Sequence, residues 1–146
     1  MSGPHQDRMR VYYEDTDAGG IVYHANYLRF AERARTEALR QAGIPHALMV
    51  EAFNRMCVVR RAEVDYAQPA RVDEELVVVT KPISVGGASL ILRQDVQGLD
   101  GASRAVIIVW LACVSVESTR PARLPPPWRD GLRAMMATQD EPILDD

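Results

Sequence analysis

The chain lacks the features that mark several broad classes of protein. Its longest apolar run, residues 105–114, is too short to cross a bilayer as a helix, which needs about 20 residues. The net charge is −3, so we do not expect the basic surface with which proteins bind nucleic acids. Residues 1–7 are polar and contain no apolar segment of a secretory signal, which predicts a cytoplasmic protein.

Cysteine is also scarce, and metal ligands do not cluster. Cys57 and Cys113 are far apart in the sequence and fall in apolar, strand-like segments, so we expect two buried, reduced thiols and no disulfide. Glu14, Asp15 and Asp17 are close together, but no further oxygen ligands follow at the spacing of a calcium loop. The sequence therefore predicts neither a metal ion nor a cofactor.

The composition is that of one ordinary globular domain. The chain has 146 residues, of which 47% are apolar and 25% are charged. This length is enough to bury a substantial core. We expect one domain over residues 1–137, followed by an acidic, disordered tail over residues 138–146.

The residue pattern predicts one long helix among strands. A first strand is expected over residues 8–16, and a helix over about residues 24–42 ends before Gly43 and Pro45. One side of this helix carries a stripe of mostly small apolar side chains: Tyr27, Ala31, Ala34, Ala38 and Ala42. Arg35 and Glu37 fall nearer to that apolar side than is usual for charged residues.

The second half of the chain reads as strands. They are expected over residues 58–66, 76–83, 89–97 and 104–117, with a short helix over residues 128–137. The strand at 104–117 is the most apolar, so we expect it to be central and covered on both faces. This order predicts an α+β fold, in which an antiparallel sheet wraps around one helix. A single helix leaves a sheet face or its edges uncovered, so we also expect oligomerisation through the sheet.

Residues 11–37 contain the most informative segment. They read as a strand, a turn that contains Asp17 and two glycines, and a helix that begins at His24 or just after it. Unpaired amides at a helix start can hold a developing negative charge, so this layout places an acid or base beside such a site. Each residue also has a structural alternative: an Asx turn for Asp17, a local hydrogen bond for His24, and core packing for Tyr13.

These residues resemble a known family. The pattern is Tyr13-x-Asp15-Thr-Asp17-x-x-Gly20-x-Val22-Tyr-His24-x-x-Tyr27, followed by Glu32-Arg33-x-Arg35-x-Glu37. It closely resembles the hotdog-fold acyl-CoA thioesterases of the 4-hydroxybenzoyl-CoA thioesterase class, and above all their YbgC branch. A weaker likeness continues through residues 65–71 and 120–125. The resemblance implies a five-stranded antiparallel sheet around one long helix, homodimers that often pair into tetramers, and active sites at the dimer interface.

The resemblance also implies roles for single residues. Asp17 matches the family's catalytic carboxylate, while Tyr13 and His24 match positions that line the same site. The amide of His24 matches the position at which the thioester carbonyl is polarised.

One segment departs from the pattern of the benzoyl-type enzymes. Basic residues before their fourth strand contact the CoA phosphates, but this chain has Val85-Gly86-Gly87-Ala88 there. Arg120 and Arg123 are therefore the candidates for holding the CoA nucleotide.

A single carboxylate is sufficient for thioester hydrolysis. The leaving thiol has a pKa near ~8.5 and needs little help from an acid. Asp17 can act as a general base on water or as a nucleophile that forms a mixed anhydride.

We therefore expect an acyl-CoA thioesterase. The alternatives are a hotdog hydratase or dehydratase, whose own motif is absent, and a non-catalytic module that binds acyl-CoA or acyl carrier protein. The sequence leaves open the acyl group and the choice between CoA and acyl carrier protein as thiol carrier.

Overall fold

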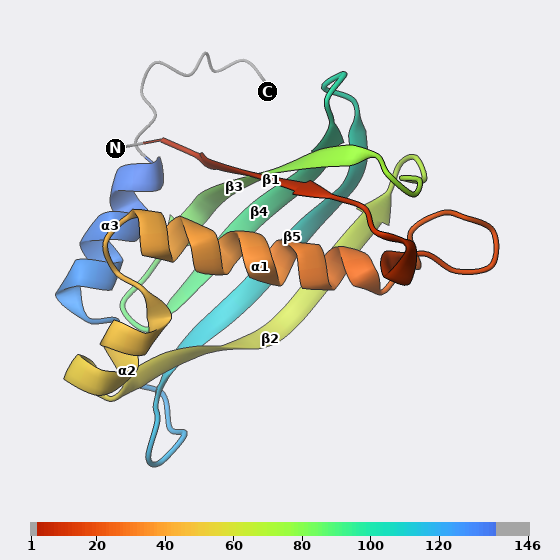
Figure 1. Ribbon diagram of the computed structural model, residues 1–146. Coiled ribbons are helices and arrows are strands. Elements are labelled where there is room, and N and C mark those ends of the chain that lie inside the picture. The colour runs from red at the N-terminus through yellow and green to blue at the C-terminus, as the bar shows by residue number, and fades with distance from the viewer. Residues whose placement is uncertain (1–2, 137–146) are drawn as a thin grey trace.

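The computed structural model describes residues 3–136, which form one sheet around one long helix. Five antiparallel strands lie in the order β1-β3-β4-β5-β2. Their bounds are β1 (His5–Arg10), β2 (Arg55–Tyr66), β3 (Glu75–Val85), β4 (Ser89–Gly98) and β5 (Ser103–Ser115). Helix α1 (Asn26–Gln41) lies across one face of this sheet (Figure 1). The expected α+β fold is confirmed; the acidic tail at 138–146 lies outside the described residues.

Helix α1 packs closely on the sheet because three of its five buried side chains are alanines. Ala31, Ala34 and Ala38 are buried in two hydrophobic clusters that α1 shares with the strands. Ala42 is exposed and does not belong to this stripe, contrary to the prediction. The reason is that α1 ends at Gln41, and Gly43 then turns the chain away with a φ of 82°.

Two strand predictions require correction. The sequence predicts a first strand over residues 8–16, but β1 ends at Arg10 and a short 3-10 helix, η1 (Tyr13–Asp15), follows. The Asp15 carboxylate stabilises this turn by accepting a hydrogen bond from the Tyr12 amide at 2.8 Å. Strand β5 does lie inside the sheet, between β4 and β2. Its side chains alternate between buried and half-buried, so only one face is fully covered.

Two short helices close one end of the sheet (Figure 1). Helix α2 (His46–Phe53) is not predicted from the sequence, because the chain between Pro45 and Asn54 is too short to show a clear helical period. Helix α3 (Pro126–Met136) begins at Pro126, earlier than predicted, because proline is tolerated in a first helical turn. The buried Trp128 donates its indole N–H to the Ile44 carbonyl at 3.0 Å and thereby fastens α3 near the end of α1.

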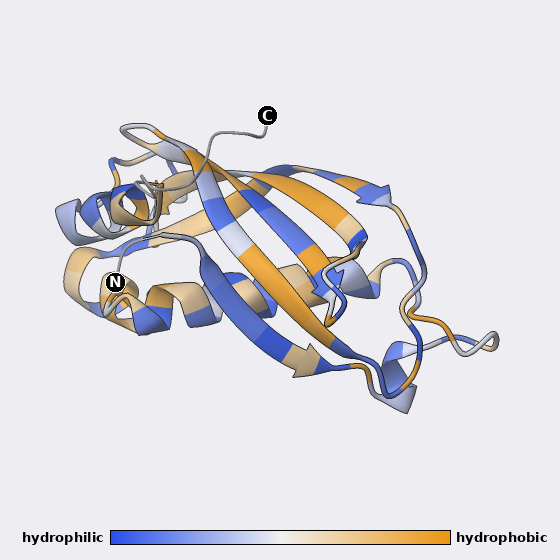
Figure 2. Ribbon diagram, turned by 90° about the horizontal axis from the view of Figure 1, so that it is seen from above, coloured by the Kyte–Doolittle hydropathy of each residue, from blue (hydrophilic) through white to orange (hydrophobic). Residues whose placement is uncertain are grey.

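The two edges of the sheet differ in character. Strand β1 is short and largely hydrophilic (Figure 2). Strand β2 is longer, and its side chains from Val58 to Glu63 are exposed on both faces. The exposed fraction of the Val59 side chain reaches 51%. A long edge strand with exposed apolar side chains is a site at which another strand can pair.

Replacement of Ala34 by leucine tests the close packing of α1. Ala34 is completely buried, so a larger side chain has no space there. Overpacking of this kind lowers the free energy of unfolding by about 1–3 kcal/mol. We expect urea denaturation to show that loss for Ala34→Leu and little change for the exposed control Arg33→Leu. An Ala34→Leu variant as stable as the wild type would contradict the close approach.

Candidate active site

The connection from β1 to α1 extends beyond the start of α1 as a narrow loop (Figure 1). An isolated β-bridge between Thr16 and Val22 closes its base. At its tip, the Asp17 amide donates to the Ile21 carbonyl and the Gly20 amide donates to the Asp17 carbonyl, both at 3.0 Å. Gly20 has a φ of 78°, a left-handed conformation that this turn requires. Asp17 therefore lies on a projecting hairpin with a defined backbone.

The Asp17 side chain is exposed and makes one local contact. Its Oδ1 accepts a hydrogen bond from the Gly19 amide at 3.0 Å, so the Asx turn considered as an alternative is present. The other carboxylate oxygen, Oδ2, has no partner within residues 3–136. The turn orients the carboxylate and leaves one oxygen available to accept a proton or to attack a substrate.

The start of α1 presents unpaired amides. The helix begins at Asn26 with Ala25 as its N-cap, and Ala25 has no side chain that could cap it. In the part of the chain that the structure describes, the amides of His24 and Ala25 donate to no acceptor. The Asn26 side chain donates to the Asp15 carbonyl at 2.8 Å and ties the helix start to the loop. A carbonyl oxygen that gains negative charge can be stabilised at such a helix start.

Aromatic side chains surround this helix start. The His24 ring lies 4.6 Å from the Tyr23 ring and 6.2 Å from the Tyr66 ring. The Tyr66 hydroxyl donates to the His24 carbonyl at 3.0 Å. Tyr27 is buried beneath them; its hydroxyl accepts from the Ala70 amide at 3.1 Å, and burial raises its pKa. The backbone of His24 is therefore fixed while its ring remains exposed.

Tyr13 lies on the same connection as Asp17. It begins η1, and its side chain is 83% exposed. The alternative interpretation that Tyr13 packs in the core is therefore wrong. The backbone of Tyr13 is held in place, because its carbonyl accepts a hydrogen bond from the Thr16 hydroxyl at 2.7 Å.

Arg123 lies at the other end of the sheet from the Asp17 loop. The Leu124 amide donates to the Gly87 carbonyl at 2.8 Å, which ties the segment after β5 to the β3–β4 turn. The Arg123 guanidinium then lies against Gly87, where an added Cβ would be 3.5 Å from both terminal nitrogens. Arg123 thus brings a positive charge to the turn whose own sequence has none. Arg120 is exposed in the tight turn that follows β5.

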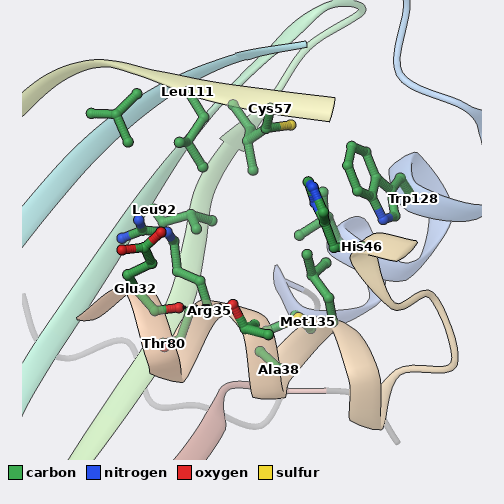
Figure 3. A pocket seen from close by; sticks show the side chains of 15 residues that line it. Glu32, Arg35, Ala38, His46, Cys57, Thr80, Leu92, Leu111, Trp128 and Met135 are labelled. Atoms are coloured by element: carbon green, nitrogen blue, oxygen red, sulfur yellow. Dashed lines mark hydrogen bonds between the residues drawn. The ribbon is translucent and has the colours of Figure 1, made fainter. Parts of the chain in front are cut away.

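A cavity of about 220 Å³ lies between the second half of α1 and the sheet, beside α2 and α3 (Figure 3). Its lining residues are Glu32, Arg35, Thr36, Ala38, Leu39, His46, Cys57, Val59, Thr80, Leu90, Leu92, Leu111, Trp128, Leu132 and Met135. Sequence reasoning missed this cavity because its walls come from all three α-helices and from four strands. The sequence feature that indicates the cavity is the charged Arg35 on the otherwise apolar side of α1.

The two cysteines face each other across β2 and β5. Cys57 pairs with Cys113 in the strand register, and both thiols are free, as predicted. Cys113 is buried, but Cys57 is only half-buried because it reaches the cavity wall. The hydrogen bond between the two thiols, together with burial, raises the pKa of Cys57. Cys57 is therefore a poor nucleophile near neutral pH.

Residues 3–136 lack two kinds of feature. That part of the chain contains no group of three or more histidine, cysteine, aspartate or glutamate side chains that could hold a metal ion. It also contains no helix that is long and apolar enough to span a membrane.

Comparison with known proteins identifies the family. Residues 19–105 match the family model described as thioesterase superfamily. The chain is 44% identical over 120 residues to the acyl-CoA thioester hydrolase YbgC of Escherichia coli, covering 80% of this chain and 87% of that protein. It is 41% identical over 118 residues to the acyl-CoA thioesterase YbgC of Haemophilus influenzae, covering 80% and 85%.

Solved structures agree with this assignment. A probable thioesterase from Bartonella henselae is 33% identical with a TM-score of 0.79, over 84% of this chain and 100% of that one. A 1,4-dihydroxy-2-naphthoyl-CoA thioesterase from Synechocystis, at 20% identity, shares the fold with a TM-score of 0.82 over 96% and 100%. The chain therefore belongs to the thioesterase superfamily, as the resemblance of residues 13–37 to the YbgC branch predicts.

Proposed function

We propose that this protein hydrolyses an acyl-CoA thioester to the free acid and CoA. The observation that carries the proposal is the exposed Asp17 carboxylate, with one free oxygen, on the connection that leads into two unpaired amides at the start of α1. The names of the curated relatives, which are acyl-CoA thioesterases, support it.

Asp17 supplies the base or the nucleophile. In one route it takes a proton from the water that attacks the thioester carbonyl, and the C–S bond breaks to release CoA. In the other it attacks the carbonyl directly, expels the CoA thiolate and forms a mixed anhydride that water hydrolyses. The carbonyl oxygen gains negative charge in both routes, and the amides of His24 and Ala25 donate to it. One such hydrogen bond stabilises the transition state by about 3 kcal/mol in comparable sites. The exposed side chains of His24 and Tyr13 line the site and position substrate or water.

The working unit of this proposal is a pair of chains joined along β2. Antiparallel pairing of two β2 strands about their centres makes one continuous sheet and sets the two α1 helices in opposite directions. Tyr66, at one end of β2, contacts His24 at the start of α1. Cys57, near the other end of β2, lines the cavity beside Ala38. The twofold arrangement therefore brings the Asp17 loop of one chain to the cavity end of its partner.

The same arrangement gives Arg123 a role. Within one chain, the 16 residues of α1, a length of about 24 Å, separate the Asp17 loop from the end of the sheet where Arg123 lies. In the pair, Arg123 approaches the reaction site of the partner subunit and is placed to contact the CoA phosphates. Arg120 is the second candidate for that contact. A phosphopantetheine on acyl carrier protein is the alternative thiol carrier.

The variant Asp17→Asn tests the chemistry. Asparagine keeps the shape and the turn but removes the charge and nearly all basicity. We expect kcat for the best substrate in an acyl-CoA panel to fall by about two to four orders of magnitude, with thermal stability unchanged because asparagine caps as well as aspartate. Retention of more than about a tenth of the wild-type kcat would show that Asp17 is only a turn residue and would contradict the mechanism.

The wild-type panel also separates the competing functions. Binding of acyl-CoA without any release of thiol would favour a non-catalytic binding module. Hydration of an enoyl thioester without release of thiol would favour a hydratase. Either result would contradict the proposed hydrolysis.

The pairing of β2 strands is tested by light scattering at micromolar concentration. We expect a mass of at least twice the 16.3 kDa of one chain. Lysine on an edge strand opposes strand pairing, so Val59→Lys should lower the measured mass. Ile83 on β3 is almost equally exposed, at 48% against 51% for Val59, and Ile83→Lys serves as the control that keeps the wild-type mass. A fully active monomer would refute the shared site.

The role of Arg123 is tested with steady-state kinetics. Loss of a charge-assisted contact to phosphate should raise KM for the acyl-CoA about tenfold in Arg123→Ala and leave kcat nearly unchanged. Added salt should weaken binding by the wild type more than by the variant, because such contacts are screened. The exposed Arg93 on β4 provides the control Arg93→Ala. An unchanged KM in Arg123→Ala would show that Arg123 does not bind the CoA phosphates.

A further inference from the structure

Arg35 places a positive charge in the wall of the apolar cavity. Its side chain extends from α1 toward the strands, in the same part of the cavity as Leu92 and Leu111 (Figure 3). Burial lowers the pKa of Arg35, because the charged form loses hydration there. A cation in such surroundings costs free energy unless an anion or several acceptors compensate it.

Gln94 holds Arg35 in this position. Gln94 is completely buried, and its Nε2 donates to the Ala31 carbonyl at 2.8 Å and to the Thr80 hydroxyl at 3.0 Å. These two bonds fix the orientation of the amide, so its Oε1 faces Arg35 and accepts from Nη1 at 3.0 Å. The guanidinium is thus braced by a side chain that belongs to the core.

Within residues 3–136, most donors of this guanidinium have no partner. Arginine has five N–H donors, and the single bond to Gln94 uses one of them. Within residues 3–136, no carboxylate oxygen lies within 4.0 Å of the Arg35 nitrogens, and Glu32 acts on them only at longer range. The Arg35 nitrogens that lack a partner are not fully buried, so they are accessible from the cavity. The cavity therefore offers preorganised donors for an anion.

We propose that Arg35 recognises a carboxylate at the far end of the acyl group, so that the preferred substrates are CoA thioesters of dicarboxylic acids. This inference rests on the proposed function, in which the partner subunit's thioester site meets the cavity. A carboxylate can accept two parallel bonds from a guanidinium, which gives both affinity and geometric selection. The leucine side chains of the wall contact the methylene chain between the two ends.

The cavity volume is large enough for a six-carbon acyl group. At about 30 Å³ for each non-hydrogen atom, 220 Å³ has room for at least about seven of them. A six-carbon dicarboxylic acyl group has that size beyond its thioester carbonyl. We therefore expect the adipoyl group to fit and to place its free carboxylate at Arg35.

Two thioether analogues of CoA test this recognition without any reaction. S-(5-carboxypentyl)-CoA carries the distal carboxylate, and S-hexyl-CoA has the same chain without it. Isothermal titration calorimetry should show at least tenfold tighter binding of the carboxyl analogue to the wild type. The variant Arg35→Met should lose this preference and bind the hexyl analogue at least as well as the wild type does. Arg33, an exposed arginine of the same helix, gives the control Arg33→Met, which should keep the wild-type preference.

The wild-type comparison is decisive even if Arg35→Met does not fold. Equal or weaker binding of the carboxyl analogue, or no binding of either analogue, would overturn the inference. Equal weakening of both analogues in a folded Arg35→Met variant would show a structural role and would also overturn it. Hydrolysis of hexanoyl-CoA together with no preference for the carboxyl analogue would leave the thioesterase proposal intact and remove only the dicarboxylic substrate.

Discussion

The alanine face of α1 lies in close contact with the sheet, and this contact determines where the other functional elements lie. Ala31, Ala34 and Ala38 are small enough for the helix backbone to approach the strands. This contact fixes the start of the helix, with its unpaired amides, beside Tyr66 at the end of β2. It also places Arg35 over the sheet, where Gln94 can hold it. The proposed reaction site and the cavity are therefore positioned by one packing interaction.

A consequence of this geometry is that one chain carries two complementary halves of the proposed site at opposite ends. The Asp17 loop projects beyond the start of α1 (Figure 1). The cavity lies along the second half of α1, and Arg123 lies beside the β3–β4 turn. The exposed β2 edge offers the surface through which a second copy can bring these halves together. The charge distribution is consistent with this division: the carboxylate is at one end, and the arginines proposed to bind anions are at the other.

The sequence predicts those parts of the fold that depend on local patterns. Helical spacing of the alanines and valine-rich alternation locate α1 and four of the five strands, and glycines mark the Gly98–Gly101 hairpin. The first strand was placed wrongly because the tyrosines after β1 look like strand residues, whereas the Asp15 carboxylate caps a 3-10 turn there. The identities of the proposed site residues also follow from the sequence, and their roles stay predictions.

Contacts between distant segments were beyond prediction from the sequence. The cavity depends on residues from seven elements. The position of Arg123 depends on long-range bonds of its segment, among them the one from the Leu124 amide to the Gly87 carbonyl. No local pattern encodes either contact. The fully buried Gln94 likewise reads as a polar residue of an alternating strand, and only the packed structure shows that it holds Arg35.

In the proposed pair each reaction site is shared by two chains, and a mixed pair of variants distinguishes this arrangement from a site within one chain. Asp17→Asn and Arg123→Ala chains, co-expressed with different tags and purified through both, form pairs that carry one defect in each chain. If each site combines Asp17 of one chain with Arg123 of the other, one site of the mixed pair carries both defects. The second site then carries neither defect. We therefore expect kcat/KM per pair to recover to about half the wild-type value, well above that of either pure variant. A mixed pair no more active than the average of the two pure variants would show that each site lies within one chain.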